Sequence, residues 1–463
     1  MNLDNLKDLN VAIIGSGGVT GKALINFLLK KVNRMILFDD LEWNNLPDIL
    51  KVKEANSKDI ILGENKAELN KVDLAVVSPG IPEDNTLIQE AMKNEIPVIS
   101  EVELAANKLK SNKIIAITGT NGKTTTTSIL GEILRKGLEQ RVVIAGNIGR
   151  PLISIVEKCH KDDVIVVELS SFQLRFINNF RPDFAAFINF SLDHLDWHIS
   201  EDSYFNSKAN IFKNQISEDY AILNYNNQEI LNLKDKLKSK VLYVGNNKED
   251  INQGVFYDDQ IIAYKDGTEE NILIYRGEVS LKGDHNIENI AFASLISYQL
   301  GVSSDIIRDV VYNYHSESHR LELVLEKANF EVYDDSKATN PHATRAALDV
   351  FEKPLILIMG GQDRNLNYDS LIDQIIEKCN YTILIGEISK IIASKFKAKN
   401  YKSFIIARDL EETVELTKDF ILNNDFKEKL TILLSPAAPS WDMFPSYKIR
   451  GQRFKEQVED KLN

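Results

Sequence analysis

The stretch that decides the fold lies at residues 114–127 and reads Ile-Ile-Ala-Ile-Thr-Gly-Thr-Asn-Gly-Lys-Thr-Thr-Thr-Thr. An apolar, β-branched run ends in a small-residue turn, and a helix-like segment follows at 128–134. This order of strand, turn and helix is typical of a phosphate-binding loop, because backbone N–H groups and a helix N-terminus attract an anion. Lys123 would reach the outer phosphates, and the hydroxyl of Thr124 would bind Mg²⁺.

The usual phosphate-binding pattern is incomplete here, because Ile117 stands where its first glycine would be. What remains is Gly-x-x-Gly-Lys-Thr, from Gly119 to Thr124. An ordinary polar turn between a strand and a helix is the alternative. The apolar strand before the turn and the Lys-Thr-Thr after it favour a nucleotide site.

The composition narrows the class of protein. A chain of 463 residues predicts about two to four domains, and 43% apolar with 27% charged residues is the balance of a soluble globular protein. A net charge of −13 argues against a nucleic-acid-binding protein. Two cysteines, Cys159 and Cys379, cannot form a disulfide framework and indicate a reducing compartment. Since neither a signal peptide nor a long apolar run is present, we expect a cytoplasmic protein that does not span a membrane.

Residues 9–100 alternate short apolar runs with helix-like segments. The apolar runs are continuous rather than alternating, which is typical of parallel strands covered on both faces. We therefore predict a first α/β unit with strands at 11–14, 35–38 and 74–77 and a helix at 22–30.

The turn from Gly15 to Gly21 resembles a dinucleotide-binding fingerprint, with Asp39 close to the position of a ribose-binding acid. The third glycine of that fingerprint is replaced by Thr20, so NAD is only one alternative. Ser78 begins a turn after another strand, where sheets of this kind bind ligands.

A second α/β unit begins near Lys113 with the phosphate-binding loop. Glu168 ends the apolar run 164–167, so we predict a magnesium ligand there if this strand neighbours the one before the loop. A carboxylate on a solvated strand end is the alternative. His194 follows a further strand in the sequence Asp-His-Leu-Asp and is a candidate for metal or phosphate binding. The other histidines of this region are interpreted as surface or core residues: His160, His198 and His315.

Two patterns follow in the second unit. Residues 241–280 alternate apolar and polar side chains between Asp-Asp and Asp-Gly turns, which predicts antiparallel hairpins. A helix is expected after Gly283, through Leu300.

A third α/β unit begins around Arg320, after a segment at 312–320 that we interpret as a hinge. Polar residues before Pro341 could simply cap a helix, but one cap needs one side chain and six polar ones are present. Since the carboxyl ends of parallel strands meet at one edge of a sheet, polar loops after several strands predict a site. Three such loops lie at 334–341, 360–364 and 435–441.

Taken in order, these motifs resemble those of the Mur ligases, the ATP-dependent amino-acid ligases of peptidoglycan assembly. The resemblance extends from about Gly15 to Tyr447. The run Asp-Ser-Lys-Ala-Thr-Asn, with Ser-Pro-Gly-Ile early and Leu-Ser-Pro-Ala late, is similar to the D-glutamate-adding branch. The segments that carry the resemblance are 118–126, 146–149, 168–174, 193–194, 285–289, 319–320 and 335–340.

The resemblance implies an α/β protein of three domains. A Rossmann-like domain, 1–111, would bind the UDP part of a nucleotide-sugar substrate rather than NAD. A central P-loop ATPase-like domain with a mostly parallel sheet, 112–318, would bind ATP. A Rossmann-like C-terminal domain, 319–463, would bind the amino acid. The implied contacts to the nucleotide sugar are Val19, Thr20, Asp39, Asp40, Ser78, Asn147, Ser170 and His194.

For ATP and magnesium, the resemblance implies a larger set of residues. Lys208 matches the lysine that carries a carbamate in the family, which would turn a cation into an anion able to take part in metal binding. From the residues alone, Lys208 would be a surface lysine. Catalytic roles are implied for Lys123, Glu168, His194 and Lys208, with Mg²⁺, as two ions, near Thr124, Glu168, Ser170, His194 and Lys208. ATP contacts are implied for Gly119, Thr120, Asn121, Gly122, Lys123, Thr124, Thr125, Asn286, Asn289, Arg320, Asp335 and Lys337.

In the third domain, Thr339, Ser440 and Tyr447 match residues that hold D-glutamate. Two residues depart from the family pattern. Arg364 replaces a lysine after the Gly-Gly turn and could pair with a carboxylate bidentately. Trp441 replaces a smaller aliphatic residue after the serine.

The implied reaction is ligation of D-glutamate to UDP-N-acetylmuramoyl-L-alanine through an acyl phosphate, driven by ATP, by a cytoplasmic monomer. Another ligase of the superfamily, either a sister Mur ligase or a folylpolyglutamate synthase, would share the ATP machinery and is the first alternative. A non-enzymatic dinucleotide-binding module is the second, and it would leave the second and third units without a role.

Overall fold

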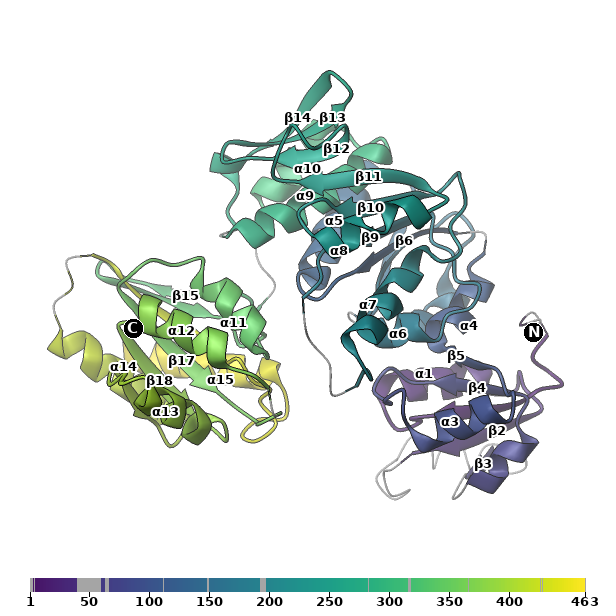
Figure 1. Cartoon of the computed structure of the whole chain (residues 1–463), viewed down its shortest axis with the longest axis horizontal. Coiled ribbons are helices and arrows are strands. Elements are labelled where there is room, and N and C mark those ends of the chain that lie inside the picture. The colour runs from purple at the N-terminus through teal and green to yellow at the C-terminus, as the bar shows by residue number, and fades with distance from the viewer. Residues whose placement is uncertain are drawn as a thin grey trace. The chain divides into compact units, whose positions relative to one another are not determined.

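Three sheets of mostly parallel strands organise the described part of the chain in the computed structural model (Figure 1). By internal contacts, the chain divides into two compact units, Met1–Val279 with Ile287–Asn313, and Ser280–Asn286 with Tyr314–Asn463. The first two sheets belong to the first unit, and the third sheet belongs to the second unit. The structure describes residues 3, 5–39, 60–62, 66–110, 112–147, 150–191, 197–281, 283–314, 318–364, 366–424, 426 and 428–462.

The first sheet has five parallel strands in the order β3-β2-β1-β4-β5. Strand β4 is buried at every position, as expected for a strand covered on both faces. The strands predicted in this region are confirmed as β1, β2 and β4. The elements are β1 Asn10–Ile14, α1 Val19–Leu28, β2 Arg34–Phe38, β3 Ile60–Leu62, β4 Leu74–Val77, α3 Thr86–Lys93, β5 Val98–Ser100 and α4 Glu101–Lys108.

The turn between β1 and α1 brings the helix close to the strand. Gly15 has a φ of +83°, a conformation that residues with side chains rarely adopt. A Cβ atom on Gly21 would lie 2.4 Å from the carbonyl oxygen of Gly15. Because Gly21 permits this contact, the helix begins at Val19, earlier than the predicted start at Lys22. The packing role of the third fingerprint glycine therefore belongs to Gly21 and not to the position of Thr20.

The second sheet has nine strands in the order β14-β13-β12-β11-β10-β9-β6-β8-β7. The predicted hairpins are present between β12, β13 and β14, which pair antiparallel. For β11 the prediction was wrong, since β11 pairs with β12 in parallel. The chain between them, 246–252, returns to the same end of the sheet before β12 begins.

The elements of this region are β6 Lys113–Thr118, α5 Lys123–Gly137, β7 Val142–Gly146, β8 Val164–Glu168, α6 Ser171–Arg175, β9 Phe184–Phe187, α7 Glu201–Ala209, β10 Tyr220–Asn224, α8 Gln228–Leu231, β11 Lys240–Gly245, β12 Gln253–Tyr257, β13 Ile261–Asp266, β14 Glu269–Tyr275, α9 Asp284–Gln299 and α10 Ser304–Tyr312. The predicted helix after Gly283 is α9.

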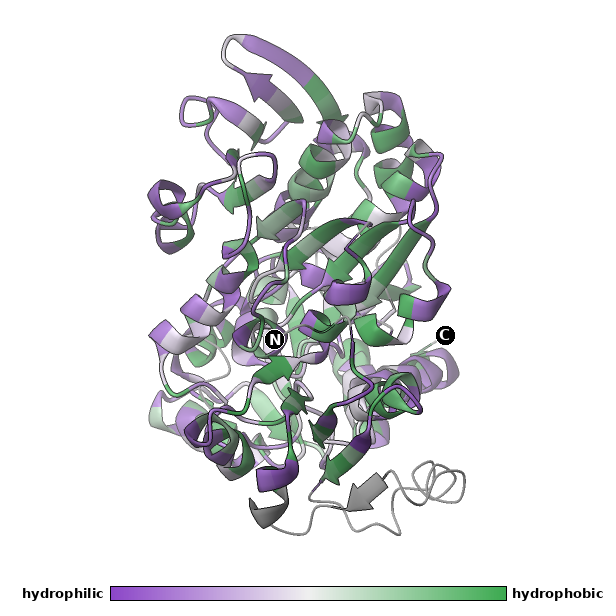
Figure 2. Cartoon of the chain, turned by 90° about the vertical axis from the view of Figure 1, so that its right-hand side faces the viewer, coloured by the Kyte–Doolittle hydropathy of each residue, from purple (hydrophilic) through white to green (hydrophobic). Residues whose placement is uncertain are grey.

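The third sheet has six strands in the order β15-β16-β20-β17-β18-β19, parallel except for the pair β15 and β16. The polar loops predicted at 334–341, 360–364 and 435–441 follow the strands β16, β17 and β20. In Figure 2 many strands of the sheets are coloured as hydrophobic, and many outer helices and loops are coloured as hydrophilic. The elements are β15 Glu322–Glu326, β16 Phe330–Asp334, α11 Pro341–Leu348, β17 Leu355–Gly360, α12 Asp369–Lys378, β18 Tyr381–Ile385, α13 Ser389–Ala398, β19 Phe404–Ile406, α14 Leu410–Asn423, β20 Leu430–Leu434 and α15 Tyr447–Leu462.

Candidate functional site

The phosphate-binding loop connects β6 to α5 at the carboxyl edge of the second sheet. Gly122 has a φ of +77°, and a Cβ atom there would lie 2.1 Å from Oδ1 of Asn289. Asn189 holds the loop, since its side-chain oxygen accepts from the N–H groups of Thr120 at 3.0 Å and Asn121 at 2.9 Å. Helix α5 has no side-chain cap and no acidic residue in its first turn. The loop therefore has a fixed shape and ends in a helix N-terminus suited to an anion.

Two lysines from distant positions in the sequence meet on one carbonyl oxygen of this loop. Nζ of Lys123 lies 2.9 Å from the oxygen of Gly119, and Nζ of Lys208 lies 2.6 Å from the same atom. Lys123 also donates to the carbonyl of Thr120 at 2.8 Å. Lys208 is only 1% exposed, so its interpretation from the residues alone as a surface lysine is wrong. Helix α7 carries Lys208 inward, where its Nζ lies 4.6 Å from the ring centre of Tyr204.

Glu168 lies beside this loop, because β8 is the parallel neighbour of β6. Its side chain is 1% exposed. Oε1 accepts a hydrogen bond from Nδ2 of Asn147 at 2.9 Å, whereas Oε2 is buried and has no hydrogen-bond partner among the residues that the structure describes. Oγ1 of Thr125 is likewise buried without a partner, and Thr124 is half-buried. Oxygen atoms of this kind are the ligands that Mg²⁺ prefers, so the residues fit a magnesium ion at this edge.

Other predicted residues of the central region are buried or form hydrogen bonds within the protein. Asn289 is buried, and its Oδ1 accepts from Oγ1 of Thr126 at 3.2 Å. Ser170 caps α6, where its hydroxyl accepts from the N–H of Gln173 at 3.3 Å. Asn286 is buried and lies three residues before Asn289 on α9. His194 lies outside the described residues.

A pocket of about 480 Å³, here called the first-sheet pocket, opens at the carboxyl edge of the first sheet. Helix α1 contributes its N-terminal end, and Asp39 accepts from the N–H of Gly17 at 2.5 Å. Ser78 closes the floor, with its hydroxyl donating to the carbonyl of Gly15 at 2.7 Å. Five predicted substrate contacts line the pocket, namely Val19, Thr20, Asp39, Ser78 and Asn147. Asp40 lies outside the described residues.

Two lining residues of this pocket were not predicted. Arg150 brings an exposed cation from the loop after β7, and Gln173 comes from α6. Nε2 of Gln173 donates to Oε1 of Glu101 at 3.1 Å, and the N–H of Ile153 donates to Oε2 at 3.0 Å. Burial raises the pKa of Glu101 to about 7, against these hydrogen bonds. Such contacts join elements far apart in the sequence, and no local pattern indicates them.

In the second unit, the three predicted loops meet at one edge of the third sheet, because β20 lies between β16 and β17. The N–H of Gly360 donates to the carbonyl of Pro436 at 2.9 Å, and that of Ala437 donates to Ala338 at 2.9 Å. Asp335 accepts from Oγ of Ser435 at 2.8 Å. Burial raises the pKa of Asp335 to about 7, although this hydrogen bond and the charge of Arg320 lower it.

The residues predicted to hold the amino acid surround these loops. Ser440 is 2% exposed, and its Oγ has no hydrogen-bond partner in the described part of the chain. The guanidinium of Arg364 lies 4.9 Å from the ring centre of Trp441, which is largely exposed. Thr339 and Lys337 are half-buried on the first loop, and Tyr447 begins α15.

Arg450 is a residue that sequence reasoning missed. It is 1% exposed and donates to the carbonyls of Ser336 at 2.9 Å, Gly360 at 3.2 Å and Ala438 at 3.1 Å. Burial lowers the pKa of this guanidinium to about 10. A single buried cation thus ties the three loops together. Only its position three residues after Tyr447 could have drawn attention to it.

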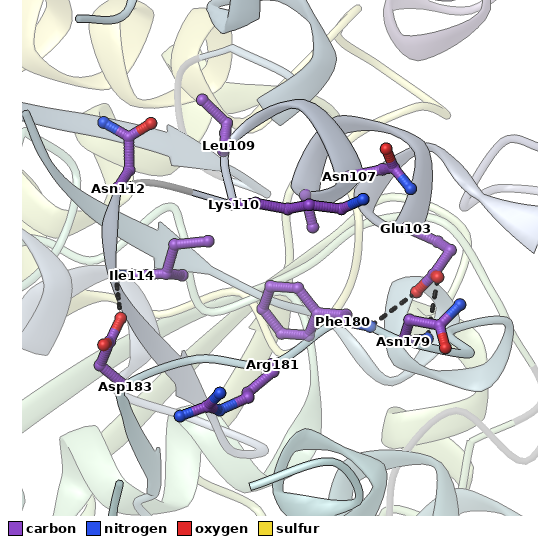
Figure 3. Close-up of a pocket in the computed structure, with 11 residues that line it drawn as sticks. Glu103, Asn107, Leu109, Lys110, Asn112, Ile114, Asn179, Phe180, Arg181 and Asp183 are labelled. Carbon is purple, nitrogen blue, oxygen red and sulfur yellow. Dashed lines mark hydrogen bonds between the residues drawn. The ribbon is translucent and has the colours of Figure 1, made fainter. Parts of the chain in front are cut away.

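A second cavity of the first unit, about 340 Å³, lies at the opposite edge of the central sheet (Figure 3). Glu103 forms one wall and accepts from the N–H groups of Asn178, Asn179 and Phe180 at 2.8–2.9 Å. Asp183 accepts from the N–H of Ile114 at 2.7 Å. The cavity holds none of the predicted site residues. Ligands of parallel sheets bind at the carboxyl edge, so the first-sheet pocket and the phosphate-binding loop remain the candidate site.

Comparison with known proteins identifies the family. Residues 9–100 match the Mur ligase MurD-like N-terminal domain, 117–297 the Mur ligase middle domain, and 319–437 the Mur ligase glutamate ligase domain. A protein of Clostridioides difficile strain 630, named UDP-N-acetylmuramoylalanine--D-glutamate ligase, is 37% identical over 98% of this chain and 99% of its own. The chain belongs to the Mur ligase family. A relative of the same name from Lachnoclostridium phytofermentans is 37% identical over 98% of both chains.

Solved structures support the fold of this Mur ligase. A UDP-N-acetylmuramate-alanine ligase from Thermotoga maritima has a TM-score of 0.57 at 17% identity, over 98% of this chain and 99% of its own. A MurF from Acinetobacter baumannii has a TM-score of 0.61 at 16% identity, over 96% and 93%. The predicted fold class, α/β with a Rossmann-like first domain and a mostly parallel central sheet, is confirmed. None of the described residues belongs to a helix that is both long enough and apolar enough to span a membrane.

Proposed function

We propose that this chain joins D-glutamate to UDP-N-acetylmuramoyl-L-alanine at the expense of ATP. The observation that carries the proposal is the near-complete match to relatives named for this reaction, at 37% identity over 98% of the chain. The match of residues 9–100 to a MurD-like N-terminal domain supports it against a folylpolyglutamate synthase and against a sister Mur ligase. It also replaces NAD binding as the role of the first glycine turn.

The first-sheet pocket is the proposed site for the nucleotide sugar. The N-terminal end of α1 offers backbone N–H groups to a diphosphate, with Val19 and Thr20 at the helix start. Asp39 would accept hydrogen bonds from the hydroxyl groups of the ribose. Arg150, a cation that also lines the pocket, would pair with the diphosphate oxygens. Ser78 and Asn147 complete the proposed contacts, and His194 and Asp40 stay predictions.

The phosphate-binding loop is the proposed site for ATP. Lys123 lies folded over the carbonyls of Gly119 and Thr120, and phosphate oxygens would take over these hydrogen bonds. Glu168, Thr124 and a carbamate on Lys208 would hold Mg²⁺, which we propose as two ions. When bound, magnesium neutralises charge on the phosphate oxygens. The adenine contacts Asn286 and Asn289 and the third-unit contacts Arg320, Asp335 and Lys337 are likewise proposed.

A carbamate on Lys208 is part of the proposal. Lys208 is buried, and its Nζ and that of Lys123 contact the same carbonyl oxygen, so a carbamate on Lys208 would place an anion next to the cation of Lys123. Addition of CO₂ to the neutral amine forms an N–C bond, releases one proton and leaves an anion beside Lys123. Incubation with ¹³C-bicarbonate should give a carbamate ¹³C signal that Lys208→Arg lacks. An identical spectrum for both proteins would contradict this part.

The L-alanyl carboxylate is a poor electrophile and has to be activated before an amine can attack it. Transfer of the γ-phosphoryl group to the L-alanyl carboxylate would give an acyl phosphate with a good leaving group. The amine of D-glutamate then attacks the carbonyl carbon, and the tetrahedral intermediate expels phosphate. Negative charge builds on oxygen atoms in both steps, so Lys123 and the loop N–H groups would stabilise it. Thr339, Arg364, Ser440, Trp441 and Tyr447 are the proposed residues that hold D-glutamate.

The test is phosphate release from ATP with UDP-N-acetylmuramoyl-L-alanine and one amino acid at a time. We expect release with D-glutamate and not with L-glutamate, L-alanine or meso-diaminopimelate. Release only with another amino acid would keep the ligase and overturn the proposed roles of Thr339, Ser440 and Tyr447. No release at all would contradict the proposed function. A cytoplasmic location and a monomeric state are parts of the proposal that fractionation and sedimentation would test.

A further inference from the structure

Glu83 is a buried carboxylate at the end of the loop that begins with Ser78. The first part of this loop, Ser78 to Ile81, lines the first-sheet pocket. Glu83 itself is 3% exposed, and its carboxylate contacts Arg175 of α6 and Ser203 of α7. Its own carbonyl is fixed by Nε2 of Gln89 at 2.8 Å. One short loop therefore contacts the pocket at one end and the central region at the other.

The carboxylate of Glu83 accepts hydrogen bonds only from residues of the central region among its described contacts. Nε of Arg175 lies 2.8 Å from Oε2. Oγ of Ser203 lies 3.0 Å from Oε1 and 3.2 Å from Oε2, and the N–H of Ile199 lies 3.3 Å from Oε1. These donors use most of the roughly four acceptor positions of a carboxylate.

The charge of Glu83 is maintained by these donors. Burial alone would raise the pKa of Glu83, but the hydrogen bonds from Ser203, Ile199 and Arg175, with the charge of Arg175, hold it below its ordinary value. An ionised acceptor makes shorter and stronger hydrogen bonds than a neutral one. The contact is therefore more than incidental packing between two sheets.

His198 extends this contact toward the phosphate-binding loop. It is 2% exposed, with Nδ1 3.8 Å from Oε2 of Glu83 and Nε2 2.9 Å from Oγ of Ser171. Its ring centre lies 5.1 Å from that of Tyr204, whose hydroxyl lies 3.1 Å from Oγ1 of Thr120. His198 is thus a buried residue between the Glu83 loop, the start of α6 and helix α7. Of the two alternatives predicted for His198, surface or core, the structure confirms the core position.

We propose that Glu83 and His198 are positioning residues that hold the substrate-lining loop 78–83 against helices α6 and α7. Helix α7 carries Lys208, and α6 follows Glu168 and Ser170, so this contact sets where the nucleotide sugar lies relative to the phosphate-binding loop. The proposal rests on the proposed function for the identity of the substrate. The structural part, fixation of loop 78–83, is independent of it.

The test uses the full chain with Glu83→Gln, which keeps the size and removes the charge, and His198→Phe, which keeps the ring and removes both nitrogens. Asp84→Asn is the matched control, because Asp84 is the exposed neighbour of Glu83. Hydrogen exchange without ligands should rise about tenfold at residues 78–83 in both variants, since loss of a charge-assisted hydrogen bond shifts local opening by that order. The control should match the wild type.

Kinetics then separate positioning from mere packing. In both variants we expect the KM for UDP-N-acetylmuramoyl-L-alanine to rise about tenfold, with the KM for ATP within about twofold of the wild type. Unchanged hydrogen exchange in Glu83→Gln would overturn the proposal. Faster exchange with an unchanged substrate KM would also overturn it, because the contact would then be structural only. A wild type that ligates no D-glutamate would contradict the proposed function, and the hydrogen-exchange result would still decide the structural part.

Discussion

The first unit contains the same strand–turn–helix arrangement twice, once at Gly15 and once at Gly119. In both, a buried parallel strand leads into a glycine turn and a helix without acidic residues in its first turn. The turn before α5 has Lys123 directly after Gly122, whereas α1 begins with Val19 and carries no lysine at that point. The first turn faces a pocket of about 480 Å³. The two turns thus have similar backbones that can each bind an anion. Their side chains determine which phosphate each turn binds.

The residues around the two turns also differ in the ligand that they suit. Near Gly119 lie two lysines and the carboxylate of Glu168, a set suited to phosphates with a metal. Near Gly15 lie Asp39 and the cation Arg150, a set suited to a ribose and a diphosphate. The fold therefore provides the anion site twice, and the residues beyond the turn separate ATP from the nucleotide sugar.

The largest expected effect is at the second turn. Lys123→Met removes the cation that would stabilise transferring charge, so kcat should fall about 10³-fold. Binding of UDP-N-acetylmuramoyl-L-alanine should stay within about twofold of the wild type, because the first turn is untouched. Steady-state kinetics and calorimetric titration measure the two effects. A parallel loss of substrate affinity would mean that the two turns are not separate sites.

The sequence predicted much of this arrangement for local reasons. Apolar runs and glycine turns locate β1, β6 and the loops that follow them, and three loops of the third sheet meet because parallel strands share a carboxyl edge. Burial of Lys208 could not be predicted from its own neighbours, since α7 mixes charged and polar residues. The contacts of Glu83, Arg150 and Arg450 depend on tertiary packing between distant segments. The family resemblance indicated a role for Lys208, and no sequence pattern indicated one for Glu83, Arg150 or Arg450.

The next effect concerns the glycines themselves. Gly122→Ala would place a Cβ atom at positive φ and 2.1 Å from Asn289, so we expect loss of about 1–3 kcal/mol in stability and much weaker ATP binding. Gly18→Ala is the matched control, because a Cβ atom there meets nothing within 4 Å and its φ is −74°. Chemical denaturation and ATP titration give both quantities. Equal tolerance of the two substitutions would show that the second turn can adjust its backbone.

A smaller effect is expected at the wall of the first-sheet pocket. Arg150→Met should weaken binding of UDP about tenfold by loss of charge-assisted hydrogen bonds, and leave binding of uridine unchanged. Arg150→Lys should restore part of the affinity, and Arg135→Met, on the exposed side of α5, is the control. Titration calorimetry with the two ligands checks this. Equal losses for UDP and uridine would assign Arg150 a structural role.

The last expected effect is a pH dependence of the free energy of unfolding, which comes from Glu101. Burial raises the pKa of Glu101 to about 7, so the folded state favours its protonated form. Its contribution to stability is complete below the unfolded pKa, near 4.5, and is lost as the pH rises toward 7. The loss amounts to about 3 kcal/mol at most. Glu101→Gln should flatten this slope in denaturation curves recorded from pH 4.5 to 7.5, and an unchanged slope would show that other groups cause it.

The central claim is that the two turns bind different phosphates at the same time. The most direct measurement is a calorimetric titration of UDP-N-acetylmuramoyl-L-alanine into the protein, first alone and then with saturating ADP and Mg²⁺. The account predicts one site per chain in both experiments and a Kd that ADP does not raise. Displacement of the nucleotide sugar by ADP, with a Kd that grows in proportion to ADP concentration, would contradict it.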